Sequence, residues 1–195
     1  MLFSLCKTAN YHYKLNAYFN KMKNFLRKLK LSDNLTIDLN ISKSEFVNKL
    51  LLITDQEKPR AYFNPFDAFK SSQKEYIGEV TYNGFNLRKR GKIFDPSINF
   101  SIATGTYDER NESLLLETEI VAFKRNNFIL FMIILFIIGY CVAIFQLALN
   151  KNWIFIPLLI VHCGIMIGFP YLMMRRSIKR MKYDLEREFY YFTKK

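Results

Sequence analysis

The stretch FILFMIILFII, residues 128–138, lies within 25 consecutive residues that hold no charged side chain, Asn126 to Asn150. After the single charge of Lys151, another 23 residues, Asn152 to Met174, are also uncharged. Helices of these lengths measure about 37 and about 34 Å at the usual rise per residue. A hydrocarbon core of about 30 Å needs about 20 such residues, and the buried helices of soluble proteins rarely stay uncharged for so long. The sequence therefore predicts two transmembrane helices.

The two spans are joined by a segment that is long enough only for a tight reversal, Asn150-Lys151-Asn152. They are therefore expected to form an antiparallel hairpin, residues 125–174, with Trp153 at the bilayer interface. Basic residues flank the outer ends of this hairpin, whereas its loop holds only Lys151. Because basic segments stay in the cytoplasm, we expect both termini inside and the loop outside.

The formal charge of +12 is concentrated at the two ends of the chain. Residues 1–30 carry seven Lys/Arg and no Asp/Glu, and residues 175–195 carry eight Lys/Arg against three Asp/Glu. The second basic segment directly follows an apolar span, where anionic lipid headgroups are its nearest partners. A nucleic-acid-binding protein instead carries its charge on one face of a folded domain. The distribution predicts a bilayer with anionic headgroups as the partner, and no nucleic acid.

The remaining sequence divides into a leader and a domain. Residues 1–31 are basic and amphipathic, which fits either a helix on the membrane surface or a mobile leader, with Met22 as an alternative start. Residues 32–124 read as a cytoplasmic α+β domain that opens with a strand at Asn34–Ile41. A capping box at Ser42 and Glu45 then predicts the helix Lys43–Ile53. Residues 54–75 lack periodicity and are expected to be loop-rich.

Four strands of an antiparallel sheet are predicted next, because apolar and polar residues alternate along them. Asn83-Gly84 predicts a type I′ turn with positive φ at both residues, between the first two strands. Phe85 and Leu87 are expected to point inward and Arg88 outward. The predicted strands are Tyr76–Tyr82, Phe85–Arg90, Ser97–Tyr107 and Leu114–Phe123.

Residues 175–195 predict an amphipathic helix, because its apolar residues recur at steps of three and four. We expect this stripe to pack mainly on the sheet, while the basic residues at the start of the helix touch anionic headgroups. The acidic residues Asp184, Glu186 and Glu188 favour this division, since a negative leaflet would repel them. The stripe consists of Ile178, Met181, Leu185, Phe189 and Phe192.

Several residues from Tyr76 onward follow a recurring pattern of strands, turn, apolar hairpin and basic helix: Gly78, Gly84-Phe85-Asn-Leu87-Arg88-Lys-Arg90, Phe94-Asp-Pro96, Gly105 and Thr118. In this pattern residues 76–192, 117 of 195, resemble a group of uncharacterised bacterial two-span membrane proteins with a small cytoplasmic β domain. The resemblance implies a similar fold and a location in the bacterial cytoplasmic (inner) membrane. It implies no activity.

The sequence offers little for catalysis. Its histidines are His12, in the leader, and His162, near the middle of the second span, where no acidic or basic residue is available to pair with it. We expect a neutral His162 that hydrogen-bonds to the other helix or to the Leu158 carbonyl. The three cysteines, Cys6, Cys141 and Cys163, show no pairing or metal-binding spacing, and no nucleotide-binding or nucleophile motif is present. The sequence thus predicts no catalytic, cofactor-binding or metal-binding residue, no cofactor, and no enzyme.

Two sets of residues remain as candidate contacts. The first is basic and fits anionic lipid or phosphate, although its strand members also fit a solvated strand face: Arg88, Lys89, Arg90, Arg175, Arg176, Lys179 and Arg180. The second forms small-xxx-small patterns that permit close packing within the hairpin: Gly139, Ala143, Gly164 and Gly168.

The fold class that follows is an α+β membrane protein: an antiparallel sheet with one packing helix, then the transmembrane hairpin, then the amphipathic helix. The leading function is a non-catalytic, membrane-tethered binding or scaffolding module, with a second copy or another protein as partner. The alternative is a lipid or small hydrophobic ligand bound in a groove between sheet and helix, since the order of elements is similar to that of helix-grip lipid-binding folds. An enzyme is the third and weakest reading.

Overall fold

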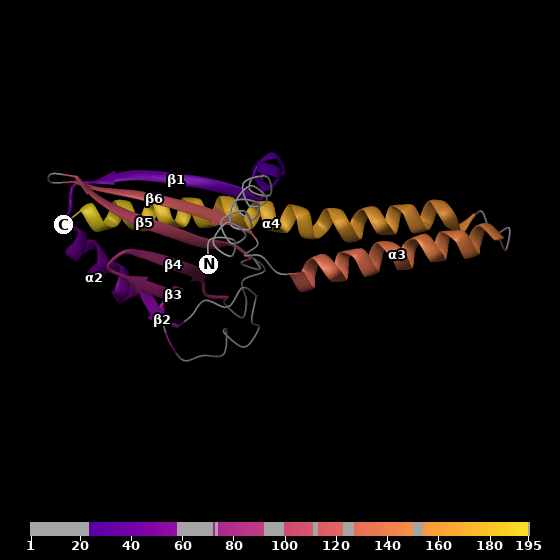
Figure 1. The fold of residues 1–195 in the computed structure, drawn as a ribbon, viewed down its shortest axis with the longest axis horizontal. Helices are drawn as coiled ribbons and strands as arrows, with labels where there is room; N and C mark the ends of the chain where they lie inside the picture. Colours follow the sequence, from indigo (N-terminus) through magenta and orange to yellow (C-terminus); the bar gives the residue numbers. More distant parts are fainter. Residues whose placement is uncertain are drawn as a thin grey trace, which may run out of the picture.

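The computed structural model describes residues 24–57, 72, 74–91, 100–110, 113–122, 127–149 and 154–194. The predicted leader up to Lys23, with Cys6 and His12, lies outside these residues, as do Phe94-Asp-Pro96 and the loop at Lys151. The described residues form an α+β fold with a six-stranded mixed sheet (Figure 1). Its elements are β1 (Ser32–Leu39), α2 (Lys43–Ile53), β2 (Thr54–Gln56), β3 (Tyr76–Thr81), β4 (Gly84–Lys89), β5 (Ile102–Arg110), β6 (Ser113–Val121), α3 (Asn127–Leu149) and α4 (Phe155–Thr193).

The sheet has the strand order β1-β6-β5-β4-β3-β2. Strands β3 to β6 follow one another as the predicted antiparallel meander, and β1 is added antiparallel to β6, with Ser32 opposite Val121. Helix α2 begins and ends at the predicted residues, because the Ser42 hydroxyl accepts a hydrogen bond from the Glu45 N–H at 3.3 Å. The sequence therefore predicted the meander and the first packing helix.

Strand β2 was not predicted. It lies in the segment expected to be loop-rich and pairs in parallel with β3, with Thr54 opposite Tyr76. The sheet is therefore mixed rather than purely antiparallel. A three-residue strand is too short to show an alternating pattern, and Thr54–Gln56 follows α2 without a break.

The β3–β4 turn differs from the predicted type I′ turn. Its two loop residues are Tyr82 and Asn83, Thr81 pairs with Gly84, and no residue of the turn has a positive φ. Gly84 is required for a different reason: a Cβ at this position would lie 2.5 Å from the Gly105 carbonyl oxygen on β5. The glycine thus serves a close approach of two strands rather than a left-handed backbone.

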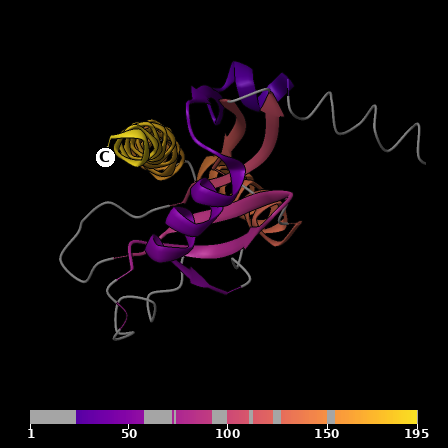
Figure 2. The ribbon, with the colours of Figure 1, turned by 90° about the vertical axis from the view of Figure 1, so that its left-hand side faces the viewer.

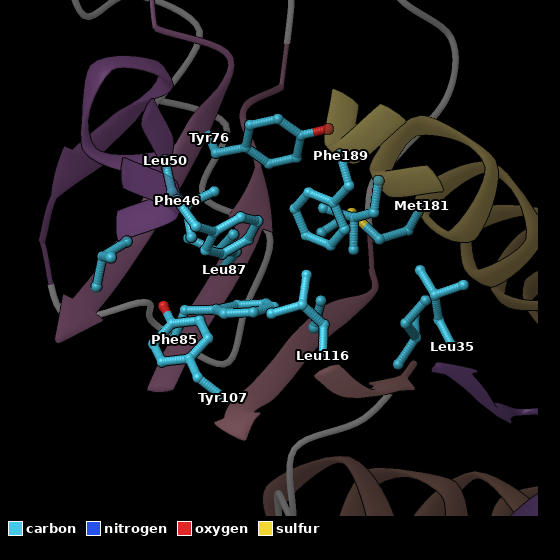
Figure 3. Close-up of a cluster of buried hydrophobic side chains, with 14 of the residues drawn as sticks. Leu35, Phe46, Leu50, Tyr76, Phe85, Leu87, Tyr107, Leu116, Met181 and Phe189 are labelled. Carbon is cyan, nitrogen blue, oxygen red and sulfur yellow. The ribbon is translucent and has the colours of Figure 1, made fainter. Parts of the chain in front are cut away.

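The hydrophobic core lies on one face of the sheet, where α2 and α4 both pack (Figure 3). Phe46 of α2 and Phe189 of α4 are both fully buried, and their ring centroids lie 5.2 Å apart in an edge-to-face arrangement. The whole predicted stripe of α4 belongs to this core, at no more than 9 % exposure: Ile178, Met181, Leu185, Phe189 and Phe192. The prediction that this stripe packs on the sheet is confirmed.

The opposite face of the sheet is not wet throughout. Arg88 lies on that face, as the alternation with Leu87 predicts, but only 4 % of it is exposed. Its neighbours in register, Ile77 on β3 and Ile102 on β5, are equally buried. The predicted direction of Arg88 is confirmed, but the reading of a solvated strand face was wrong, because Arg88 shares its face with two buried apolar neighbours.

Helix α4 is a single rod of 39 residues that belongs to two environments (Figures 1 and 2). Its C-terminal part lies along the sheet, whereas its N-terminal part extends away from the domain beside α3. No residue before Ser177 is buried in this helix. The predicted boundary between residues 174 and 175 thus falls inside one continuous helix.

Helix α4 is long and apolar enough to cross a membrane. The apolar stretch described with its side chains in α3, Leu135–Gln146, is shorter than a bilayer requires. Among the described residues, one helix rather than two therefore qualifies as a span, and the predicted transmembrane hairpin is not shown.

Candidate membrane-surface site

The predicted basic contacts fall into two groups that the structure places differently. Arg175, Arg176, Lys179 and Arg180 lie on α4, in the turns that follow its last uncharged residue, Met174. Three of them are exposed and Arg175 is partly buried. These four side chains therefore gather where the apolar part of the helix meets the domain.

The strand residues Arg88, Lys89 and Arg90 are instead engaged inside the domain. Arg90 is 7 % exposed; its guanidinium forms an ion pair with Asp55 and also donates from Nε to the Lys74 carbonyl at 3.0 Å. Arg88 is buried, as described above, and Lys89 pairs with an acidic residue of α4. A buried, paired cation does not reach a lipid surface, so we restrict the proposed headgroup contacts to α4.

The partner of Lys89 is Asp184, one of the acidic residues that the sequence was expected to keep away from a negative leaflet. Asp184 is only 6 % exposed and its carboxylate accepts from the Lys89 ammonium at the edge of the core. The signal for this burial was present in the sequence, because Asp184 follows Met181 by three residues and so shares the buried face of α4. Burial raises the pKa of the neighbouring Tyr76 hydroxyl, and the negative charge of Asp184 raises that pKa further.

The Lys89–Asp184 ion pair should make single and double substitutions differ in their effect on the free energy of unfolding. Breaking a buried pair by removing one partner typically costs about 3–5 kcal/mol, whereas replacing both partners by apolar residues is often neutral. We expect Asp184→Ala to lower the free energy of unfolding of the sheet domain by about 3 kcal/mol, and Lys89→Leu/Asp184→Leu to recover most of it. Pulse proteolysis in urea on the detergent-solubilised protein measures both. The exposed pair of Arg110 with Asp108 provides the control, and equal losses in Asp184→Ala and Arg110→Ala would contradict the assignment.

Polar contacts fix α4 to the domain just beyond its exposed part. The Ser177 hydroxyl accepts hydrogen bonds from the N–H groups of Phe100 and Ser101 at 3.0 and 3.2 Å. The Ser101 hydroxyl in turn donates to the Ser177 carbonyl at 3.2 Å. At the far end of the helix, the Lys49 ammonium donates to the Phe192 carbonyl at 2.6 Å. The helix is therefore attached to the domain at both ends of its packed part.

The contact between α3 and α4 is carried by a polar pair rather than by glycines. The hydroxyl of Tyr140 on α3 hydrogen-bonds to Nδ1 of His162 on α4, and the two rings are stacked with centroids 6.0 Å apart. Tyr140 precedes Lys151 by 11 residues and His162 follows it by 11, so the two lie at equal depth in an antiparallel pair. The expectation that His162 bonds to the other helix is met.

The predicted close packing through Gly139, Ala143, Gly164 and Gly168 is not seen at the glycines. A Cβ built at Gly139, Gly164 or Gly168 meets no described atom within 4 Å. The contact that the structure describes between the two helices is instead the one between Tyr140 and His162, and close packing through the small residues stays a prediction.

The described residues include no group of three or more His, Cys, Asp or Glu side chains that would hold a metal ion. Cys141 and Cys163 are free thiols on the two helices. The predictions of no metal, no cofactor and no catalysis remain predictions.

Comparisons with protein-family models, with curated proteins and with solved structures find no match to this chain. The resemblance to bacterial two-span membrane proteins therefore stays an expectation from sequence.

Proposed function

We propose that this chain is an integral membrane protein in which α3 and the first part of α4 cross the bilayer as a hairpin. The domain built on the sheet is a non-catalytic binding or scaffolding module held at the membrane surface. One observation carries this proposal: α4 is a single helix whose first half exposes large apolar side chains, while its second half lies in the core of the domain.

The exposed half of α4 would be costly in water. Fully burying one large apolar side chain is worth about 1.5–3 kcal/mol, and nine such residues of α4 are about half or more exposed. Together they represent on the order of 10 kcal/mol of unfavourable hydration. Hydrocarbon provides this burial along a helix without charges. The nine residues are Phe155, Leu158, Ile160, Val161, Ile165, Met166, Ile167, Phe169 and Leu172.

The continuity of α4 favours a scaffolding role. A flexible linker would let the domain move freely, whereas an unbroken helix fixes the domain at a set distance from the bilayer. Phe46, Leu116 and Phe189 fill the core between sheet and helices at zero exposure (Figure 3). The alternative, a ligand in a sheet–helix groove, would therefore use the open hollow of about 460 Å³ between β1 and the end of α4. We propose a second copy or another protein as the partner, which native mass spectrometry of the detergent-purified protein would identify.

The proposed orientation places both termini in the cytoplasm, on the charge argument that seven basic residues flank the hairpin and only Lys151 lies in its loop. Reporter fusions after Lys195 and before Ser32 are expected to report the cytoplasm. A tag at Lys151 is expected to be accessible from outside intact cells.

A fusion at Lys195 that reports the outside would overturn this orientation. As a control, replacing Lys124 and Arg125 by Gln together with Arg175, Arg176, Lys179 and Arg180 should weaken the bias and give mixed topology, because the rule counts charges near the span ends.

A further inference from the structure

A hollow of about 260 Å³ lies beside α4 at the level where the helix leaves its apolar part. Four basic side chains line it: Arg27 and Lys30 from the segment before β1, and Arg175 and Lys179 from α4. Its volume is just below the about 300–1,000 Å³ typical of small-molecule pockets. It suits a small anionic group better than a larger organic ligand.

The segment before β1 is built to present its basic residues here. The N–H groups of Leu31 and Lys30 donate to the carbonyls of Leu26 and Arg27 at 2.8 and 2.9 Å, which is a Schellman closure of the short helical turn. Lys30 occupies the left-handed position of this closure, with φ of 55°. The Tyr171 hydroxyl on α4 also donates to the Leu29 carbonyl at 3.0 Å, so the turn is held against the helix.

Two residues that line the hollow each have one buried polar atom without a hydrogen-bond partner among the described residues. These atoms are the hydroxyl oxygen of Ser32, a residue that is only 8 % exposed, and Nε of Arg175. Buried donors are normally hydrogen-bonded, so each of these two groups can still donate to an acceptor that a small shift of its side chain would bring within reach. A phosphate oxygen accepts from both a hydroxyl and a guanidinium.

The hollow contains one acidic side chain, Asp33, and its charge is already matched. One Asp33 carboxylate oxygen accepts from the Lys182 ammonium at 3.0 Å, and the other accepts from the Asn34 N–H at 2.8 Å. Asp33 therefore does not neutralise the basic residues that line the hollow. Of these, Arg27 also donates to the side-chain oxygen of Asn34 at 3.0 Å when the amide O and N of Asn34 are exchanged.

We propose that this hollow binds the phosphate group of an anionic phospholipid. The inference rests on the membrane location proposed above and adds a specific headgroup site to it. Lys179 follows Met174 by five residues, which is about 7 Å along the helix, and a headgroup layer is about 5–8 Å thick on each side of the hydrocarbon core. Phosphate at this depth comes from lipid rather than from solution.

Native mass spectrometry of the full-length detergent-solubilised protein tests the site, with phosphatidylglycerol, phosphatidylcholine and inorganic phosphate as probes. Phosphatidylglycerol is expected to bind most tightly. Arg175→Gln and Lys30→Gly are each expected to weaken it about tenfold, the equivalent of losing one charge-assisted hydrogen bond. Lys28→Gln removes one exposed charge outside the hollow and should weaken binding about twofold, because salt screens distant charges.

Lys30→Gly separates binding from folding. Glycine adopts a positive φ freely, so this variant should keep or raise the melting temperature while it loses the lipid. If the hollow variants and the control variant lost equal affinity for phosphatidylglycerol, binding would depend only on the overall charge of the protein, and the proposed site would be wrong. If inorganic phosphate displaced the lipid at an equal concentration, the hollow would be a site for free phosphate rather than for a phospholipid. Extraction of the wild-type protein from membranes by alkaline carbonate would instead overturn the membrane proposal itself.

Discussion

Replacing Phe189 with alanine is expected to lower the free energy of unfolding of the sheet domain by about 3–5 kcal/mol, the usual cost of deleting a buried phenylalanine. Phe189 is fully buried, and its ring lies 5.2 Å from that of Phe46, 6.0 Å from that of Phe85 and 6.1 Å from that of Phe192. It therefore joins α4 to both α2 and the sheet. Its loss leaves a cavity that three elements border and none can fill alone.

The neighbouring residue supplies a matched control. Tyr190 is one position further along α4 and is 56 % exposed, so Tyr190→Ala should change the free energy of unfolding by no more than about 0.5 kcal/mol. Pulse proteolysis in urea measures both variants. Deleting residues 184–195 should have a larger effect in the same direction, seen as faster cleavage within residues 32–123. Full protease resistance of the truncated chain would mean that α4 does not hold the domain together.

The features that the sequence predicted well are those that local pattern decides. Helix α2 was correct because Ser42 caps its first turn and its apolar residues recur at helical spacing. The packed face of α4 was correct because the steps from Ile178 to Phe192 match one side of a helix. In β6, Leu114, Leu116, Thr118 and Ile120 are buried in strict alternation, as the period of two requires.

The features that could not be predicted from the sequence depend on contacts between residues that are distant in the chain. The parallel pairing of β2 with β3 is decided by the sheet and not by Thr54–Gln56 itself. Gly84 was assigned to a turn, although it is required by Gly105, 21 residues further on. Buried Arg90 pairs with Asp55, and partly buried Lys89 pairs with Asp184. The sequence pattern therefore predicted solvated or lipid-facing cations where the fold pairs them with acidic residues from distant segments.

The candidate headgroup site shows the same limit. The basic residues of α4 could be selected from their position after an apolar span. Arg27 and Ser32 could not, because they reach the hollow only when the start of the domain packs against a helix more than 140 residues later. No periodicity or motif links two segments so far apart.

Placing two arginines on the exposed half of α4 is expected to remove the protein from the membrane. Leu158 and Ile165 are 67 % and 61 % exposed, and both lie in the uncharged stretch of the helix. An arginine at the centre of a membrane helix costs about 2.5–3.5 kcal/mol on the insertion scale. The double variant Leu158→Arg/Ile165→Arg therefore loses about 5–7 kcal/mol of insertion free energy. Most of the protein should then appear in the alkaline carbonate supernatant or be degraded, whereas the wild type stays in the membrane pellet.

Leu158→Ile/Ile165→Leu is the control, because it conserves volume and hydrophobicity, and it should remain in the pellet with the wild type. The exposed apolar surface could be covered by a bilayer or by a second copy of the chain, and these two possibilities predict different results for the wild-type protein as well. If the surface were covered by a second copy of the chain in water, the wild type would be extracted as an oligomer and the arginine variant as a monomer. A bilayer and an oligomer interface would both exclude arginine. The two are therefore distinguished by whether the wild-type protein appears in the carbonate pellet or in the supernatant. A wild-type protein in the pellet supports insertion of α4, and a soluble wild-type oligomer refutes it.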